Sequence, residues 1–149
     1  MGDANLYGGY VALTALEPLT GQYTVSANNE KRRKWAAYDY ANDDSKKVID
    51  DLWLTMYNNI FNANLVIDKL RHEERTLFEE GVREIMLAEM LAMRAYMYFD
   101  LVRMFNEPYA VNAESNNVPW KTSWDATIGE RHTSERLLAQ LMDELAEAK

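Results

Sequence analysis

The feature that most constrains this chain is a pair of long segments in which apolar residues recur at alternating spacings of four and three. This spacing places the apolar residues on one face of an α-helix. The segments cover residues 45–70 and about 76–105, and only a short charged stretch, residues 72–75, separates them. The sequence therefore predicts two long helices that form an antiparallel hairpin, within an all-α fold. The apolar face of the first helix consists of Ile49, Trp53, Met56, Ile60, Ala63, Ile67 and Leu70.

The second helix is apolar around most of its circumference, which indicates packing against more than one neighbour. Its row of small residues is expected to lie against the large residues of the first helix, and one polar row is expected to face solvent. The small-residue row is Gly81, Ile85, Ala88, Ala92, Ala95, Phe99 and Val102. The other apolar rows are Leu87, Leu91, Arg94, Tyr98, Leu101 and Phe105, and Met86, Met90, Met93 and Met97. The solvated row is Glu89, Tyr96, Asp100 and Arg103.

One charged residue, Arg94, stands among the apolar residues of the second helix. A buried charge needs a partner. A ligand contact is possible, but a buried bridge to a carboxylate or to an asparagine of the first helix is favoured, because charges in protein cores are usually paired. Glu89 is a poor partner, since residues five apart on a helix are not neighbours. The available asparagines are Asn58, Asn59, Asn62 and Asn64.

The segments around the hairpin are shorter and less regular. A short helix is expected over residues 4–16, and residues 20–44 and 106–132 lack helical periodicity and are expected to be irregular. Thr133 or Ser134 is expected to cap a last helix. Because that helix reaches Lys149 without a cap, we expect residues 1–149 to be a single helical domain at the N-terminal end of a longer protein. Its expected inner face is Leu138, Leu141, Leu145 and Ala148.

Composition excludes several classes of function. The chain carries 16 basic and 24 acidic residues, a net charge of −8, which argues against nucleic acid as a partner. It has no cysteine, so disulfides and cysteine zinc sites are excluded. No phosphate loop, nucleophile elbow or dinucleotide motif is present. His72 and His132 are far apart in sequence and do not supply a metal-ligand set. We therefore expect no catalytic residue, no metal and no cofactor.

The two irregular segments are unusually rich in aromatic residues. Trp35, Tyr38 and Tyr40 occur in the first one, with Asn29 and Arg33 close by in sequence. Flat rings stack on the C–H faces of sugars, and amide and guanidinium groups bind hydroxyls, so this set is typical of a carbohydrate-binding surface. The alternative is that the rings only pack the loops against the helices. The second segment holds Tyr109, Trp120 and Trp124.

Two stretches of the chain together resemble one known family. Residues 52–64 read Leu-Trp-Leu-Thr-Met-Tyr-Asn-Asn-Ile-Phe-Asn-Ala-Asn, and residues 88–105 contain the pattern Ala-Glu, Arg-Ala, Tyr-Phe-Asp-Leu-Val-Arg. Val118-Pro119 and then Arg131 and Glu135 follow in the same order. From about Tyr7 to the end, this order and spacing resemble the SusD-like (SusD/RagB) proteins. The matching positions expected to be structural are Trp53, Tyr57, Asn64, Glu89, Arg94 and Phe99.

The resemblance implies tetratricopeptide-like antiparallel helix pairs with long irregular loops. It also implies a surface lipoprotein of the outer membrane that binds glycans or other nutrients, works with a SusC-like TonB-dependent transporter and carries out no chemistry. Family members are anchored through an N-terminal cysteine, which this sequence does not contain. By position, the loop with Trp35, Tyr38 and Tyr40 is the implied ligand site.

Two other classes of function remain open from the sequence. A tetratricopeptide-type scaffold would bind peptides in an uncovered groove around Asn58, Asn62 and Asn64. A helical glycosidase would need two carboxylates about 5 to 9 Å apart in a pocket. Nutrient binding ranks first, the peptide scaffold second and the enzyme last.

Overall fold

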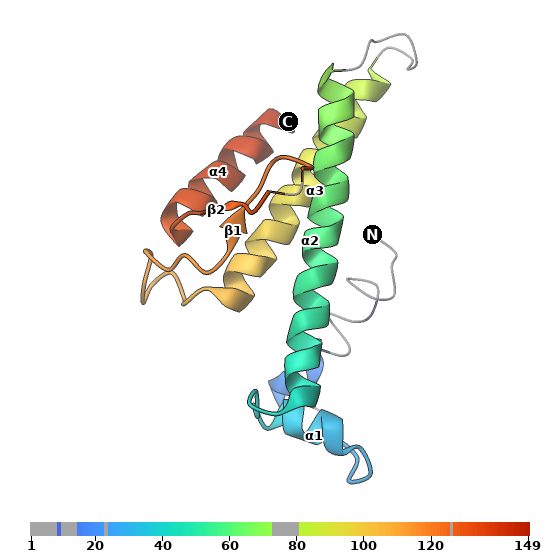
Figure 1. Ribbon diagram of the computed structural model, residues 1–149, viewed down its shortest axis with the longest axis vertical. Helices are drawn as coiled ribbons and strands as arrows, with labels where there is room; N and C mark the ends of the chain where they lie inside the picture. Colours follow the sequence, from blue (N-terminus) through green and yellow to red (C-terminus); the bar gives the residue numbers. More distant parts are fainter. Residues whose placement is uncertain (1–8, 10–14, 23, 73–80, 126) are drawn as a thin grey trace. The chain divides into compact units, whose positions relative to one another are not determined.

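The computed structural model describes residues 9, 15–22, 24–72, 81–125 and 127–149, and the chain divides into two compact units, Met1–Tyr57 and Asn58–Lys149 (Figure 1). The described residues are mostly helical, which confirms the all-α prediction. The elements are the 3-10 helix η2 (Glu17–Thr20), α1 (Glu30–Ala36), α2 (Asp43–His72), α3 (Val82–Phe105), β1 (Pro119–Trp120), β2 (Glu130–Arg131) and α4 (Ser134–Glu147). The helix expected over residues 4–16 lies almost entirely outside the described residues.

Helix α1 belongs to the first unit and interrupts the segment expected to be irregular. It begins after Asn29, whose side-chain oxygen accepts a hydrogen bond from the Arg32 amide at 3.1 Å. The prediction of an irregular stretch over residues 20–44 is therefore wrong for residues 30–36. A helix of seven residues with Trp35 as its one buried side chain is too short to show a periodicity in the sequence.

Helix α2 extends two residues beyond each end of the predicted range. Asp43 and Asp44 lie in its first turn, and Lys69 and Arg71 in its last, where each charge is stabilised by the helix dipole. In the second unit its predicted apolar face is confirmed, because Ile60, Ala63, Ile67 and Leu70 are buried. In the first unit Met56 is buried, whereas Ile49 and Trp53 are half-buried.

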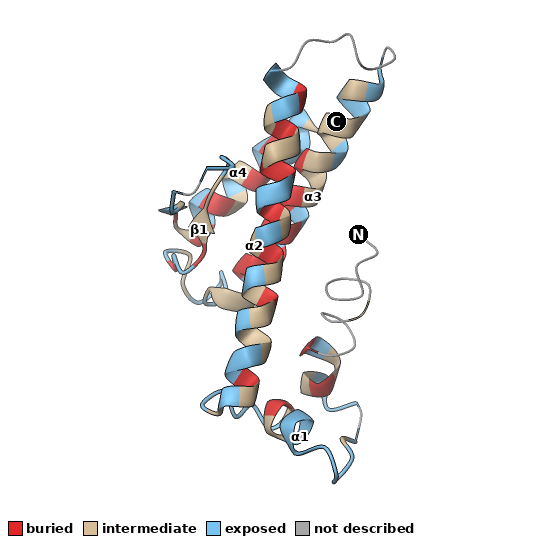
Figure 2. Cartoon of the chain, turned by 45° about the vertical axis from the view of Figure 1, so that its right-hand side comes forward, coloured by how far each residue is buried: buried red, intermediate tan, exposed pale blue. Residues whose placement is uncertain are grey.

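Helix α3 runs antiparallel to the second-unit part of α2, as the hairpin prediction requires (Figures 1 and 2). Its most buried row is not the small-residue row but the one that contains Leu91, Arg94, Tyr98 and Leu101. From the small-residue row, Ala92, Ala95 and Phe99 line a groove together with α4, and Ile85 is 61% exposed. The expectation that this row faces the first helix of the hairpin is therefore wrong.

The solvated row of α3 needs one correction. Glu89, Tyr96 and Arg103 are exposed, as predicted, but Asp100 is buried. Its carboxylate accepts a hydrogen bond at 3.1 Å from the guanidinium of Arg103, one turn further along the helix. This neighbour on the same helix satisfies the charge of Asp100 locally.

Helix α4 begins after Thr133, whose hydroxyl accepts a hydrogen bond from the Arg136 amide at 3.2 Å, which confirms the predicted cap. Its predicted inner face is wrong by about one residue. Leu141 is buried as expected, but Leu138 is only half-buried and Leu145 is 50% exposed. A carboxylate from α4 lies in the core instead of an apolar side chain. The buried residues of α4 are Ser134, Leu137, Leu141 and Glu144.

The segment between α3 and α4 contains a two-stranded antiparallel ribbon, β1 with β2, in which Trp120 lies opposite Glu130. Before the ribbon, the side-chain amide of Asn106 donates hydrogen bonds to the Ser115 carbonyl at 3.1 Å and to Ser134 Oγ at 2.7 Å. At Gly129, a Cβ atom would lie 2.5 Å from the Trp120 carbonyl oxygen. The ribbon therefore requires glycine at this position.

Candidate functional site

The aromatic residues expected to bind sugar meet at the C-terminal end of α1. The Tyr40 ring stands edge-on to Trp35, at 5.4 Å between centroids, and to Tyr38, at 6.2 Å. Trp35 is only 8% exposed, and its indole N–H donates a hydrogen bond to the Ala15 carbonyl at 2.7 Å. Tyr38 and Tyr40 are 57% and 44% exposed. The structure thus places Trp35 as a buried support, and the two tyrosines as the accessible rings.

Tyr38 occupies a backbone conformation that usually requires glycine. Its φ is +58°, and α1 ends in a Schellman motif, with the Tyr38 amide donating to the Trp35 carbonyl and the Asp39 amide to the Lys34 carbonyl. The ring is held in place, because the Tyr38 hydroxyl donates to the Leu19 carbonyl at 2.5 Å. A bulky residue in this region of φ costs energy, and such positions concentrate at functional sites.

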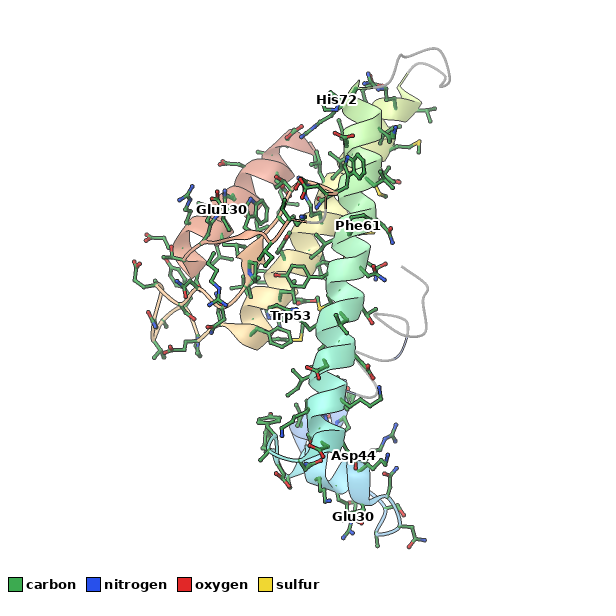
Figure 3. The ribbon with its side chains drawn as sticks, in the orientation of Figure 1. Glu30, Asp44, Trp53, Phe61, His72 and Glu130 are labelled. Atoms are coloured by element: carbon green, nitrogen blue, oxygen red, sulfur yellow. The ribbon has the colours of Figure 1, made fainter. Side chains whose placement is uncertain are left out.

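The polar residues predicted beside these rings lie on α1 or at its start. Asn29 caps the helix, and Arg33 is exposed on it. A salt bridge of 2.9 Å between Lys31 Nζ and Asp44 Oδ1 ties α1 to the first turn of α2, where Figure 3 labels Asp44. Burial, and to a smaller extent the nearby Tyr38, raises the pKa of Tyr40.

A pocket of about 370 Å³ lies beside α1 in the same unit. The oxygen Oε2 of Glu17 is buried there and has no hydrogen-bond partner among the described residues. Sequence reasoning missed Glu17, because a glutamate before a proline at the expected end of a helix gives no functional signal. The lining residues are Glu17, Pro18, Thr24, Val25, Ser26, Asn29 and Arg32.

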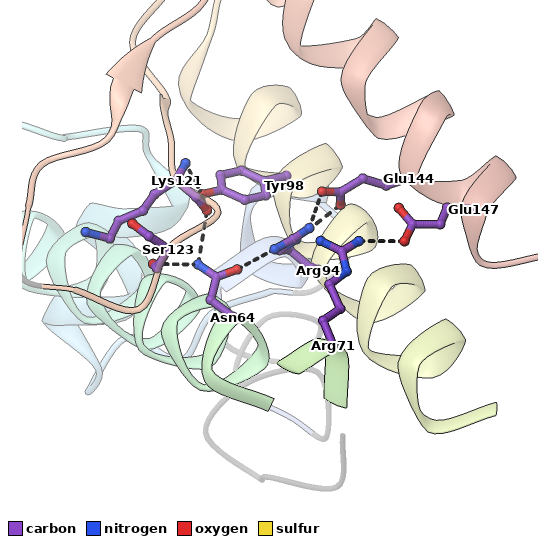
Figure 4. A network of polar contacts seen from close by, with 8 residues as sticks. All are labelled: Asn64, Arg71, Arg94, Tyr98, Lys121, Ser123, Glu144 and Glu147. Atoms are coloured by element: carbon purple, nitrogen blue, oxygen red, sulfur yellow. Dashed lines mark hydrogen bonds and ion pairs between the residues drawn. The ribbon is translucent and has the colours of Figure 1, made fainter. Parts of the chain in front are cut away.

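In the second unit, Arg94 forms the buried bridge that the sequence favoured (Figure 4). It is 2% exposed, and both its Nε, at 3.2 Å, and its Nη2 donate hydrogen bonds to the Glu144 carboxylate. Its Nη1 donates to Asn64 Oδ1 at 2.6 Å. At the edge of this network, Arg71 pairs with Glu147 at 2.5 Å. Arg94 is therefore a core residue whose charge is satisfied, and the expectation of a paired buried arginine is confirmed.

The same network fixes the segment that follows β1. The side-chain amide of Asn64 donates to the carbonyls of Lys121, at 3.1 Å, and Ser123, at 3.0 Å (Figure 4). The Tyr98 hydroxyl donates to the Lys121 carbonyl at 2.9 Å and accepts from the Lys121 amide at 2.8 Å. Burial raises the pKa of Tyr98 above its ordinary value. Residues of α2, α3 and α4 thus meet around one buried polar cluster.

The second group of loop aromatics does not gather at one place. The Trp120 ring packs on Tyr98, with a centroid distance of 4.5 Å. Trp124 is exposed, and its indole N–H donates to Asp68 Oδ2 at 3.1 Å. Tyr109 is exposed on the segment that follows α3.

The remaining residues expected to be structural differ in burial. Trp53 and Tyr57 are half-buried on α2, with their rings tilted at a centroid distance of 4.8 Å. Phe99 is partly exposed beneath the guanidinium of Arg103, at 5.4 Å from the ring centroid. Glu89 is exposed on α3, so it does not share the buried environment of Arg94.

The described part of the chain gives no support for a metal site. No group of three or more His, Asp or Glu residues within it is arranged to hold a metal ion. His132 is buried between Gln140 Oε1, at 2.7 Å, and Glu130 Oε2, at 3.3 Å, whereas His72 pairs with Asp68. Among the described helices, none combines the length and the apolar character that crossing a membrane would need.

Comparison with known proteins identifies the family. A family named SusD-like_3 and described as starch-binding associating with outer membrane matches residues 6–149, which is nearly the whole chain. No curated protein and no solved structure matched. The chain therefore belongs to the SusD-like family of binding proteins, whose members bind starch in association with the outer membrane.

Proposed function

We propose that this chain is the N-terminal part of a non-catalytic, lipid-anchored glycan-binding protein on the cell surface, which passes its ligand to a SusC-like TonB-dependent transporter. The family match over residues 6–149 is the observation that carries this proposal. The exposed tyrosine pair at the end of α1 supports it, since accessible rings are needed for stacking on sugars.

Within this function, we assign the ligand surface to the end of α1. Tyr38 and Tyr40 would stack on the C–H faces of sugar rings, while Trp35 supports Tyr40 from below. Arg33 and the amide group of Asn29 would donate hydrogen bonds to hydroxyls. Hydrogen bonding of the Tyr38 hydroxyl to Leu19 fixes one ring before the ligand arrives, which reduces the entropy lost on binding.

A binding experiment on the full-length protein tests this surface. We expect isothermal titration with maltoheptaose, an oligosaccharide of starch, to give about tenfold weaker binding for Tyr38→Gly and for Tyr40→Ala, or about 1.4 kcal/mol each. Glycine suits the backbone at position 38, so the first variant removes the ring without adding strain. Tyr109→Ala, which removes an exposed tyrosine of the other unit, is the matched control. Equal affinity of all three variants and the wild type would remove the tyrosine pair from the site.

The cellular part of the proposal has a separate test. Metabolic labelling with a fatty acid and protease shaving of intact cells should show a lipid-modified, surface-exposed product. Affinity purification from solubilised outer membranes should recover a TonB-dependent transporter with it. An unlabelled protein inside the cell would contradict the proposal.

The structure weakens the peptide-scaffold alternative. That alternative needs Asn58, Asn62 and Asn64 to line an open groove, but Asn64 is buried and all its side-chain hydrogen-bonding groups are engaged with Arg94, Lys121 and Ser123. For the enzyme alternative, Glu17 is the single carboxylate among the described residues that line the pocket beside α1. Hydrolysis would need a pair.

A further inference from the structure

The pocket beside α1 shares Asn29 with the ligand surface proposed above, contains neither tyrosine, and combines three segments of the first unit. Glu17 and Pro18 come from η2, residues 24–26 from the segment that follows, and Asn29 and Arg32 from the start of α1. Its volume of about 370 Å³ falls within the range of small-ligand sites, roughly 300–1,000 Å³.

The first observation that points to a ligand is the carboxylate of Glu17. Its Oε2 is buried and accepts no hydrogen bond from any described residue. Leaving a buried acceptor unpaired is costly, because the group has lost water and gained no partner. The same side chain lines the pocket, and rotation about the last torsion of a glutamate is soft. The pocket therefore offers an acceptor that is ready for a hydroxyl donor.

Hydrogen-bond donors also line the pocket. Arg32 lines the pocket and contributes guanidinium N–H donors. The side-chain oxygen of Asn29 is occupied by the Arg32 amide, which leaves the amide N–H groups as its contribution. Ser26 Oγ accepts from the Asn28 amide at 3.4 Å and keeps its own hydrogen to donate.

The chemistry of the lining selects the class of ligand. Glu17 and Arg32 balance each other in charge, so an acidic ligand would meet the carboxylate and a basic ligand would meet the guanidinium. Pro18 and Val25 supply apolar surface for C–H groups. A molecule with hydroxyls on its edge, C–H groups on its face and no net charge fits these walls.

We propose that this pocket is a subsite for one neutral pyranose unit of the glycan, in which Glu17 accepts hydrogen bonds from neighbouring hydroxyls and Arg32 and Asn29 donate to others. The inference rests on the proposed glycan-binding function and adds a second contact to the tyrosine surface. The residues of this subsite bind the ligand by hydrogen bonds, whereas Tyr38 and Tyr40 bind it by stacking.

Titration calorimetry of the full-length protein with maltoheptaose tests the subsite. We expect Glu17→Gln and Arg32→Met each to weaken binding at least tenfold, and Glu17→Leu to weaken it further. Glu114→Gln and Arg136→Met, which change exposed residues of the second unit, are the matched controls and should bind like the wild type. Circular dichroism melting of each variant shows whether the fold is retained.

Nuclear magnetic resonance of the unmodified protein gives a second measurement that no folding defect can confuse. Titration with methyl α-glucopyranoside should shift the backbone amides of Thr24, Ser26 and Arg32 more than those of α4.

The two proposals fail in different ways. If the wild type binds maltoheptaose, the Tyr38 and Tyr40 variants weaken binding and the Glu17 and Arg32 variants do not, the subsite is overturned and the glycan function stands. If methyl α-glucopyranoside leaves these amides unshifted while glycylglycine shifts them, the pocket takes a zwitterion and the pyranose assignment is wrong. If the protein reaches the cell surface with its lipid but binds no neutral glycan, the subsite is overturned while the cellular role stands.

Discussion

At the scale of single residues, Arg94 is a buried charge of the second unit with partners on two other helices. Its guanidinium is buried and binds the Glu144 carboxylate with two nitrogens and Asn64 with a third. Burial raises the pKa of Glu144, while hydrogen bonding and charge from Arg94 oppose that rise. Each group is tolerable in the core only because the other is present, since a lone buried charge is far more costly than a pair.

Replacement of Arg94 by leucine should therefore be strongly destabilising. We expect Arg94→Leu to lower the free energy of unfolding by about 3–5 kcal/mol, because Glu144 is left without its partner. The double variant Arg94→Leu with Glu144→Leu should recover part of this loss. Urea unfolding followed by circular dichroism measures both, and Arg136→Leu, at an exposed arginine of α4, is the control. An unfolding midpoint unchanged in Arg94→Leu would show that the bridge contributes no stability.

A second residue-scale prediction concerns pH. A hydrogen bond from the Lys121 ammonium holds the pKa of Asp125 well below its ordinary value of 3.8, and hydrogen bonds from Thr127 lower this pKa further. A carboxyl whose pKa is lower in the folded state stabilises the fold above its unfolded pKa, and this contribution is lost as the pH falls through the folded value. We expect the stability difference between the wild type and Asp125→Asn to stay constant above about pH 5 and to shrink progressively as the pH falls below that value.

Urea unfolding at several pH values measures that difference. Asp143→Asn is the matched control, because the Asp143 side chain is exposed on α4. A difference between wild type and Asp125→Asn that stays constant over the whole pH range would argue against the ion pair with Lys121 as its origin.

At the scale of elements, the sequence predicts long helices well and their orientation poorly. The ends of α2 and the C-terminal end of α3 agree with the predicted ranges within two residues, because many apolar residues recur with one period. Helix α3 has three apolar rows, so its pattern alone does not tell which row faces which neighbour. The rotation of α4 follows from Arg94, which requires Glu144 in the core. No periodicity records such a pairing between distant residues.

For the candidate site, too, the sequence indicates one part and misses another. The tyrosines and Trp35 lie within six residues, so that their proximity follows from the chain itself, and their enrichment was visible in the sequence. The pocket combines Glu17 with residues 24–26 and Arg32 through a segment without periodicity. Its members are ordinary polar residues, and only the folded backbone brings them together. Helix α1 was also missed, although Asn29 is a favourable helix cap.

The ribbon of β1 and β2 supports a prediction at this scale. Gly129→Ala should destabilise the second unit by about 1–3 kcal/mol, because the added methyl group would overlap the Trp120 carbonyl and backbone cannot move aside cheaply. Thermal unfolding monitored by circular dichroism measures the effect. Arg131→Ala, at an exposed position of β2, should leave the melting temperature almost unchanged. Equal melting temperatures for both variants would show that the ribbon adapts.

At the scale of the whole molecule, the second unit exposes an apolar groove of about 500 Å³ between α3 and α4. Residues predicted for the inner face of the last helix lie here, beside the small-residue row of α3. Contiguous apolar surface of this kind favours association. The lining residues are Ala92, Ala95, Tyr96, Phe99, Leu138, Leu141, Met142 and Leu145.

We expect residues 1–149 to bind a hydrophobic dye and to self-associate as their concentration rises. The double variant Met142→Gln with Leu145→Gln should reduce both, because these exposed side chains lie along the groove. Analytical ultracentrifugation measures the extent of self-association. Leu54→Gln, which replaces an exposed leucine of α2, serves as the comparison. A monomer at all concentrations with weak dye binding would contradict the prediction.

The cluster around Asn64 and Arg94 also has a consequence for motion. If α4 separated from the second unit by itself, it would take Glu144 away and leave the arginine charge in an apolar environment. If the segment after β1 separated, the Asn64 amide would lose both of its acceptors. Separation of one element alone therefore carries the cost of unpaired buried groups, whereas separation of all these elements together incurs that cost only once. In hydrogen exchange, the central amides of α3 and α4 should become labelled in step, as one cooperative unit.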